Sequence, residues 1–428
     1  MSKLTVGLFN DSFPPTIDGV ANAVLNYATF IQKNHGNAVV ATPRYPNVTD
    51  DYPFQVIRYA STGLGKKIGY RAGYPFDLSA VAAIEKCKLD IIHSHCPFVS
   101  TVLARVMRYY TGVPIVFTYH TKFDIDIGKR VALRPMQEVS LHFLVSNIRA
   151  CDEVWVVSEG AGQNLRSIGY KGQYIVMPNG TDFTRGRASQ QDIDALRGKH
   201  GIAGDETVLL FVGRMMWYKG IRLILDGLRD AAAEGCRFKM IFVGDGYERQ
   251  EMMDYAKTCG LERQCIFPGV VRDREELRVY YSLADLFLFP STYDTNGLVV
   301  REAAACECPC LLIRGSCAAE GVIDSDTGIL IDETSHALGR AVVAACTDRQ
   351  RLRRIGRHAS EKLYLSWEDS VARAYERYQI VLQNAKPRKR RLMPAGQLMR
   401  RQAKGMRRSY RRVQSKVARK VRRFLDEL

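Results

Sequence analysis

Short apolar segments alternate with helical segments along this chain, and this alternation limits its fold more than any other feature. The strand-like segments of the first half are short and mostly apolar. They are Leu4–Phe9, Ala38–Ala41, Gln55–Tyr59, Ile91–His93, Ile115–Tyr119, Glu153–Val157 and Tyr174–Met177. Helical stretches such as Ala21–Gln32 and Thr101–Tyr109 lie between several of them. Strands that alternate with helices form a parallel sheet with helices on both faces, so we predict an α/β fold.

The same pattern starts again after an interruption. Pro178-Asn-Gly180 is a turn signal, and a polar segment follows from Arg185 to His200. The second series of strand-like segments consists of Thr207–Val212, Phe238–Val243, Cys265–Phe267, Leu286–Phe289, Cys310–Ile313 and Gly328–Ile331. A chain of 428 residues is long for one domain. We therefore predict two Rossmann-like domains, 1–185 and 186–365, with a linker near 180–200 and a terminal helix within 366–385.

Positive charge is concentrated at the C-terminal end of the chain. The formal net charge is +17, and 17 of the 62 Lys and Arg residues lie from Lys386 onwards, against two acids. In this tail, residues 386–428, apolar side chains recur at spacings of three and four. They are Met406, Tyr410, Val413, Val417, Val421 and Phe424. A basic helix with one apolar stripe is typical of a segment that lies on an anionic membrane surface, which we predict as its partner. A nucleic-acid-binding arm and a solvated tail are the alternatives.

The remaining composition favours a cytoplasmic protein that does not span a membrane. No signal peptide is expected, because Lys3 precedes only a short apolar segment, and no apolar run approaches the ~20 residues that span a bilayer. The 11 cysteines are scattered. Cys306-Glu-Cys308-Pro-Cys310 lacks a second cluster at metal-site spacing, so we interpret these cysteines as buried reduced thiols.

Asp294 and Glu302 stand eight positions apart after the strand-like segment Leu286–Phe289, with Gly297 between them. We expect Asp294 on a loop at the C-terminal edge of a strand, where ligands bind in open α/β sheets, and Glu302 in the first turns of the next helix. Carboxylates accept paired hydrogen bonds from adjacent hydroxyls, so this pair suits a polyhydroxylated ligand. The alternative is that neither residue binds a ligand, with Asp294 an ordinary loop residue and Glu302 a solvated residue on its helix.

Two earlier strand-like segments also end in glycine turns. The first leads into Gly213-Arg214 and then Lys219-Gly220, ahead of a helical stretch, and the second leads into Gly244-Asp-Gly246. Two cations together with the free backbone N–H groups of a helix N-terminus can hold a diphosphate. Each turn alone is a weak signal, because any Rossmann-like unit offers one.

In this order the motifs resemble the donor-binding half of retaining, nucleotide-sugar-dependent glycosyltransferases of the GT-B fold. Gly213-Arg214, Lys219-Gly220, Gly244-Asp-Gly246, Phe267-Pro-Gly269 and the two carboxylates carry the resemblance. In the first half, Phe13–Val20, Ile91–Phe98 and Phe117–Thr121 are similar to the signatures of the same family. The resemblance covers about residues 4–380. It implies two Rossmann-like domains that face each other across a ligand cleft, with the terminal helix packed back on the first domain.

The resemblance also implies roles for residues of the second domain. Arg214 and Lys219 would neutralise the leaving diphosphate, Asp294 would bind hydroxyls of the donor sugar, and Glu302 would bind the ribose. The rest of the donor site would be formed by Gly213, Gly244, Asn296, Gly297 and Leu298, by the backbone near Val270, which would meet the base, and by Gly19 of the first domain. No cofactor or metal is expected, because basic side chains and helix dipoles neutralise the diphosphate in this fold.

Histidines end two strands of the first domain. The resemblance places His95 near the acceptor and His120 near the reacting sugar, and a structural histidine is the alternative for either. We interpret His93, inside its strand, as structural. Asp124-Ile-Asp126 has the spacing of a metal-binding triplet but follows a strand of the first domain, so we interpret it as an acceptor-side loop.

The sequence departs from the family in ways that leave the donor sugar open. Asp294 stands where Glu is common, and Asn296 stands where an aromatic residue or Gln is common. Tyr119–Phe123 resembles glycolipid-forming members, the bacterial diacylglycerol glucosyltransferases. With the basic tail, this predicts transfer of a hexose from a UDP-sugar to a membrane lipid such as diacylglycerol, at the inner face of the cell membrane. A soluble sugar or polysaccharide acceptor, a nucleotide-sugar epimerase and a nucleic-acid-binding protein are the alternatives.

Overall fold

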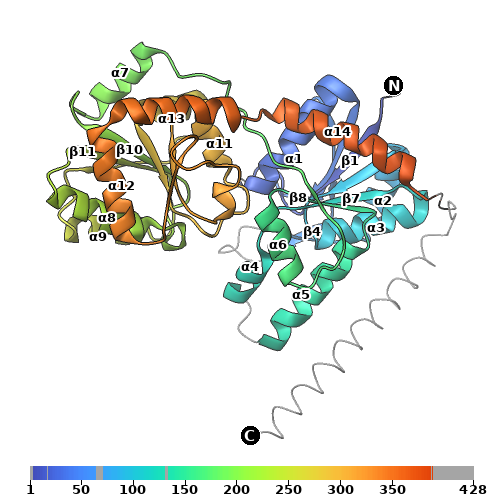
Figure 1. Ribbon diagram of the computed structural model, residues 1–428. Coiled ribbons are helices and arrows are strands. Elements are labelled where there is room, and N and C mark those ends of the chain that lie inside the picture. The colour runs from blue at the N-terminus through green and yellow to red at the C-terminus, as the bar shows by residue number, and fades with distance from the viewer. Residues whose placement is uncertain (1–2, 17, 64–70, 131–133, 387, 389–428) are drawn as a thin grey trace, which may run out of the picture. The chain divides into compact units, whose positions relative to one another are not determined.

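The computed structural model describes residues 3–16, 18–63, 71–130, 134–386 and 388. The chain divides into two compact units (Figure 1). Unit 1 consists of Met1–Val157, Ala161–Met177 and Ser370–Leu428, and unit 2 consists of Ser158–Gly160 and Pro178–Asp369. The apolar stripe predicted for the basic tail lies outside the described residues.

Unit 1 is built on a parallel sheet of seven strands in the order β3-β2-β1-β6-β7-β8-β9. The strands are β1 (Thr5–Phe9), β2 (Asn37–Pro43), β3 (Gln55–Tyr59), β6 (Ile91–Ser94), β7 (Ile115–Tyr119), β8 (Glu153–Val156) and β9 (Ile175–Val176). A separate antiparallel pair, β4 (Ser61–Gly63) and β5 (Arg71–Gly73), was not predicted. The central strands β6 and β7 are buried along their whole length, as expected for strands of a parallel sheet that is covered on both faces. The predicted parallel sheet of the first domain is confirmed.

Short polar side chains cap the first two helices of unit 1. The helices of this unit are α1 (Gly19–Phe30, continued by a π-helical turn at Ile31–His35), α2 (Leu78–Lys86), α3 (Val99–Thr111), α4 (Phe123–Arg130), α5 (Arg134–Arg149) and α6 (Glu159–Ser167). Asp18 accepts hydrogen bonds from the backbone N–H groups of Val20 and Ala21 and so begins α1. Asp77 begins α2 in the same way.

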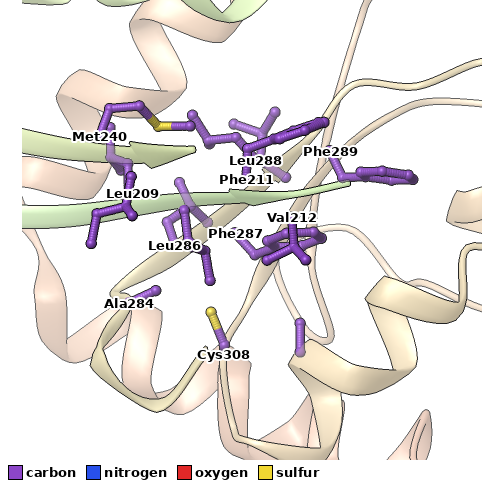
Figure 2. Close-up of a cluster of buried hydrophobic side chains, with 14 of the residues drawn as sticks. Leu209, Phe211, Val212, Met240, Ala284, Leu286, Phe287, Leu288, Phe289 and Cys308 are labelled. Carbon is purple, nitrogen blue, oxygen red and sulfur yellow. The ribbon is translucent and has the colours of Figure 1, made fainter. Parts of the chain in front are cut away.

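Unit 2 repeats this architecture with a parallel sheet of six strands in the order β12-β11-β10-β13-β14-β15. The strands are β10 (Thr207–Val212), β11 (Phe238–Val243), β12 (Cys265–Gly269), β13 (Leu286–Phe289), β14 (Cys310–Ile313) and β15 (Ile329–Ile331). Side chains of β10, β11 and β13, including Leu209, Met240 and Leu288, form a buried core together with Cys308 (Figure 2). The second parallel sheet confirms the predicted fold of two Rossmann-like domains.

The helices of unit 2 alternate with its strands. They are α7 (Gln190–Lys199), α8 (Ile221–Ala233), α9 (Arg249–Thr258), α10 (Arg274–Leu283), α11 (Leu298–Ala305), α12 (Ser335–Thr347) and α13 (Arg349–Lys362). About half of the segment interpreted as a linker, 180–200, is the helix α7. Ser189 caps this helix by accepting a hydrogen bond from the Asp192 N–H, and Ile193 and Leu196 are buried in the core of unit 2.

The last helix, α14 (Trp367–Asn384), starts in unit 2 and continues in unit 1. Within unit 1, the Tyr375 hydroxyl accepts a hydrogen bond from the Leu4 N–H at 2.8 Å. Tyr378 stacks on Trp155 with 5.3 Å between ring centroids, and Arg377 pairs with Glu153 at 2.7 Å. These contacts hold the helix on β1 and β8 of the unit 1 sheet.

Candidate active site

The glycine turns and the carboxylate loop of unit 2 meet at one edge of its sheet. They follow β10, β11, β12 and β13, which are neighbours in the order β12-β11-β10-β13. Parallel strands place their carboxyl ends along the same edge, where ligands bind in open α/β folds. The structure therefore brings together the motifs that are well separated in the sequence.

The first two glycine turns lie in direct backbone contact. The Gly213 N–H donates to the Val243 carbonyl at 3.0 Å, and the Gly244 N–H donates to the Gly269 carbonyl at 2.9 Å. A Cβ atom added at Gly244 would overlap the carbonyl oxygen of Gly213, and one added at Gly246 would overlap that of Met215. Glycine is thus required for packing between the turns, in addition to the predicted role of Gly213 and Gly244 toward a ligand.

Lys219 and Asp294 form an ion pair with each other. The Lys219 ammonium donates to both carboxylate oxygens of Asp294, at 2.6 and 2.8 Å, and the Ser291 hydroxyl donates to Oδ2 at 2.6 Å. The two charged side chains are only 9% and 24% exposed. Sequence analysis gave these residues separate roles and did not predict their contact. The adjacency of β10 and β13 explains it.

The surroundings of this ion pair are aromatic and tightly packed. The Lys219 ammonium lies 5.7 to 5.8 Å from the ring centroids of Tyr218, Phe289 and Tyr293. Gly220, at the N-terminus of α8, has a φ of +80°, and an added Cβ would come within 2.5 Å of the Pro290 carbonyl oxygen. The loops after β10 and β13 therefore leave little freedom to the ammonium.

Arg214 differs from Lys219 because it remains available. Its side chain is exposed and makes no hydrogen bond or ion pair with any residue that the structure describes. A guanidinium presents donors in a planar fork that matches phosphate oxygens. Arg214 is therefore a cation at the sheet edge that can meet an anionic ligand without breaking an existing contact.

Glu302 lies on α11 and is held by two donors that sequence analysis did not identify. Oε1 accepts from Arg274 at 2.8 Å, and Oε2 accepts from the Tyr281 hydroxyl at 2.9 Å. Arg274 also pairs with Asp182. The Glu302 side chain is 12% exposed. No sequence signal pointed to these partners, because Arg274 and Tyr281 are ordinary residues of a helix.

Three other predicted donor-site residues lie between the two carboxylates in the chain, and Val270 follows the edge strand β12. Gly297 has a φ of +56° and begins α11, with Leu298 as the first residue of that helix. The Nδ2 atom of Asn296 is buried and has no hydrogen-bond partner among the described residues. Val270, after β12, is 54% exposed.

Gly19, the donor-site residue predicted in the first domain, is exposed at the start of α1 in unit 1. An added Cβ there would meet no described atom within 4 Å.

Three histidines lie together at the carboxyl ends of β6 and β7 in unit 1. His93 is fully buried, and its ring nitrogens bond to Tyr378 and Thr118, each at 2.6 Å, which fits the structural role predicted for it. His95 Nδ1 lies 2.9 Å from His120 Nε2, so the two predicted site histidines are hydrogen-bonded to each other. His95 Nε2 is buried without a partner among the described residues.

Burial decides the charge of these two imidazoles. It lowers the pKa of His120 to about 3. It also lowers the pKa of His95 well below its usual value, with a further contribution from His93 and His120. Both rings are therefore neutral near pH 7 and can exchange hydrogen bonds but carry no positive charge.

The prediction of a loop at Asp124 is wrong, because Phe123–Arg130 forms the helix α4. Phe123 and Ile127, four positions apart, both pack into the core of unit 1, and this spacing favours a helix. The Asp124 carboxylate accepts a hydrogen bond from Asn164 at 3.1 Å.

Cysteines and possible metal ligands add no further site. Cys306, Cys308 and Cys310 are buried and unpaired, and burial raises the pKa of Cys306 to about 12. In the described part of the chain, no group of three or more His, Cys, Asp or Glu side chains could hold a metal ion. Of the described helices, none is long and apolar enough to cross a membrane.

Two protein families match the two halves of the chain. The family described as Glycosyltransferase Family 4 matches residues 17–185, and the family described as Glycosyl transferases group 1 matches residues 192–362. An alpha-monoglucosyldiacylglycerol synthase of Streptococcus pneumoniae is 27% identical over 384 residues, which cover 88% of this chain and 85% of that protein. A D-inositol 3-phosphate glycosyltransferase of Nocardia farcinica is 30% identical over 311 residues, which cover 68% of this chain and 67% of that protein.

Solved structures share the fold. Anabaena HepE in complex with UDP superimposes with a TM-score of 0.71 at 19% identity, over 88% of this chain and 100% of that chain. At this identity the likeness shows that the fold is shared.

Proposed function

This chain belongs to the group 1 and family 4 glycosyltransferases of the GT-B fold, and we propose that it moves a hexose from a UDP-sugar to a membrane lipid, with diacylglycerol as the first candidate. The observation that carries the proposal is the edge of the unit 2 sheet, where two cations and two carboxylates come together. Transfer would retain the anomeric configuration, as the family resemblance implies.

The arrangement at this edge suits a nucleotide sugar. Arg214 and Lys219 supply positive charge for a diphosphate, and hydrogen bonds between ionised groups and phosphate are short and strong. Asp294 and Glu302 supply acceptors for adjacent hydroxyls, and the unpartnered Nδ2 of Asn296 supplies a donor. Uracil is the first base to test, because the HepE structure contains UDP.

The proposed chemistry depends on the charge that develops on the leaving phosphate. Arg214 and Lys219 would stabilise this charge, and the loss of one such contact typically costs ~10²–10³ in rate. The Lys219 ammonium has a third N–H that can donate to the phosphate while two donate to Asp294, and Oδ1 of Asp294 keeps a lone pair for a sugar hydroxyl. In unit 1 the neutral His95–His120 pair would serve the transfer through hydrogen bonds.

A lipid acceptor is supported by two independent observations. The Streptococcus pneumoniae relative is named as a synthase of alpha-monoglucosyldiacylglycerol and is matched over 85% of its length. Residues from Lys386 onwards carry 17 Lys and Arg against two acids, which suits an anionic bilayer surface. We place the enzyme at the inner face of the cell membrane for these reasons. The second candidate is a soluble polyol acceptor, because the Nocardia farcinica relative is named for D-inositol 3-phosphate.

Incubation of the full chain with radiolabelled nucleotide sugars and a total lipid extract tests the proposal. We expect label from one UDP-hexose in the organic phase, and labelling ~10²–10³-fold slower with the Lys219→Ala variant. Label that enters only water-soluble products would favour the soluble acceptor, and label that stays in the nucleotide sugar would contradict both candidates. Sugar exchange without any acceptor would point to an epimerase.

A further inference from the structure

We propose that Arg274 is a positioning residue that holds the Glu302 carboxylate ready for a ribose by tying it to Asp182. The inference rests on the proposed function, because it takes Glu302 as the carboxylate that binds the nucleoside. It assigns a role to three residues, Arg274, Asp182 and Tyr281, that belong to no motif of the chain.

One guanidinium joins two carboxylates in this arrangement. Arg274 is the first residue of α10, and its Nε donates to Asp182 Oδ2 at 2.8 Å. Its Nη2 donates to the other oxygen of Asp182 and to Glu302 Oε1, the latter at 2.8 Å. A guanidinium can do this because its donors form a rigid planar fork, whereas a lysine ammonium on its flexible stem cannot.

Asp182 is itself fixed by the backbone of unit 2. The Thr181 N–H donates to the Leu365 carbonyl at 2.8 Å, and the Trp367 N–H donates to the Thr181 carbonyl at 3.0 Å. A Cβ atom added at Gly180 would overlap the backbone of Ser366, so the two segments lie in contact. The Arg274 guanidinium also lies 4.3 Å from the centroid of the Phe183 ring. The guanidinium is therefore held against segment 180–183 by Asp182 and the Phe183 ring.

Tyr281 completes the orientation of Glu302 from the other side. Its side chain is fully buried, and its hydroxyl donates to Oε2 at 2.9 Å while Arg274 donates to Oε1. With one donor on each oxygen, the carboxylate plane is set. Each carboxylate oxygen has a second lone pair, so Glu302 can still accept hydrogen bonds from two vicinal hydroxyls. The contacts of Arg274 and Tyr281 thus orient Glu302 without using up its capacity.

The experiment compares ligands that differ by one ribose hydroxyl. Binding of UDP and of 2′-deoxy-UDP to the full chain is measured by calorimetry for the wild type, Arg274→Gln, Arg274→Lys and Tyr281→Phe. We expect the wild type to prefer UDP about tenfold, the change expected for one hydrogen bond to a charged acceptor. Arg274→Gln should cost UDP both of its contacts with Glu302 but cost 2′-deoxy-UDP only the contact of its 3′ hydroxyl, so it should weaken UDP about tenfold more than 2′-deoxy-UDP and bring the ratio close to one. Arg274→Lys and Tyr281→Phe should give intermediate ratios.

Arg237→Gln is the matched control. Arg237 pairs with Asp205, and both residues precede their strands, β11 and β10, at the amino edge of the same sheet. This variant loses an Arg–Asp pair of unit 2 without touching the carboxyl edge, so its ratio should equal that of the wild type. Thermal unfolding of each variant checks that the fold persists.

Each other outcome identifies the step that fails. If Arg274→Gln keeps the wild-type ratio, or weakens both ligands equally, the positioning role is overturned while the proposed function stands. If the wild type binds both ligands equally, the ribose role of Glu302 is wrong, and the inference fails with it. GDP and 2′-deoxy-GDP are measured in parallel, so that an error in the proposed base appears as binding of the guanine pair alone, and the ratio is then determined on that pair.

Discussion

Asp294→Asn is expected to strengthen the binding of free UDP while it removes most of the sugar transfer. Asp294 accepts two hydrogen bonds from the Lys219 ammonium, at 2.6 and 2.8 Å. A diphosphate that reaches Lys219 must compete with this carboxylate and is repelled by its charge. Asparagine keeps the size of the side chain and removes that charge.

The size of the effect follows from the geometry. A phosphate oxygen on the same ammonium would lie about 5 Å from the carboxylate, where two unit charges repel by ~0.8 kcal/mol in water and ~3 kcal/mol at an effective dielectric constant of 20. The Asp294 side chain is 24% exposed, so a value between these limits applies. An intermediate value of ~2 kcal/mol corresponds to about 30-fold tighter binding of UDP.

Calorimetry of UDP binding at fixed ionic strength, together with transfer rates, measures both halves of this prediction. Ser291→Ala is the first control, because it removes a hydrogen bond to Asp294 at 2.6 Å and keeps the charge. Asp205→Asn is the second, because it breaks an ion pair at the amino edge of the sheet. Neither control should tighten UDP binding. A UDP dissociation constant for Asp294→Asn that equals or exceeds the wild-type value would refute the reasoning.

The remaining predictions concern charge, acid stability, metal and membrane. Lys219→Ala and Arg214→Ala should each lower kcat ~10²–10³-fold in transfer assays, and near-normal turnover in both would remove the diphosphate assignment. Burial lowers the pKa of His120 from 6.5 to about 3, so the unfolded chain takes up this proton first as the pH falls. The stability that this neutral histidine contributes is therefore complete above pH ~6.5 and ~2 kcal/mol lower at pH 5. Urea titrations at both pH values should show a smaller loss of stability for His120→Asn than for the wild type. EDTA should leave the transfer rate unchanged, and a strict need for Mn²⁺ or Mg²⁺ in the chemical step would contradict this. Truncation to residues 1–385 should abolish salt-sensitive co-sedimentation with anionic vesicles but keep UDP binding, and equal sedimentation of both proteins would exclude a tail anchor.

The fold could be predicted from the sequence because the central strands carry a strong local signal. Strands buried on both faces are continuous apolar runs, and for this reason Thr207–Val212 and Leu286–Phe289 have the predicted bounds. Signals that depend on tertiary contact were weaker. The helix α4 was missed because only burial of Phe123 and Ile127 separates it from a polar loop, and α7 because its segment is mostly polar.

The site was predictable as a set of positions but not as a set of contacts. Parallel topology places every strand end at one edge, so residues that follow strands can be assigned to a common site from the sequence. Which side chains then touch depends on the order of the strands and on helices between them. Arg274 and Asp182 are 92 positions apart, and no spacing rule connects them.

The unpredicted contacts have a common physical cause. Burying a carboxylate without a cation costs free energy, so a partly buried site for hydroxyls and phosphate needs a cation beside each carboxylate. Here each carboxylate that is proposed to bind the ligand has its own cation, Lys219 for Asp294 and Arg274 for Glu302. The two pairs differ in what a ligand would do to them. In the first, Lys219 would share its three donors between Asp294 and the diphosphate that it is proposed to bind, whereas in the second Arg274 is also held by Asp182. A substitution of Lys219 or of Asp294 thus disrupts the whole ion pair, so the effects of the two substitutions on ligand binding are coupled rather than additive.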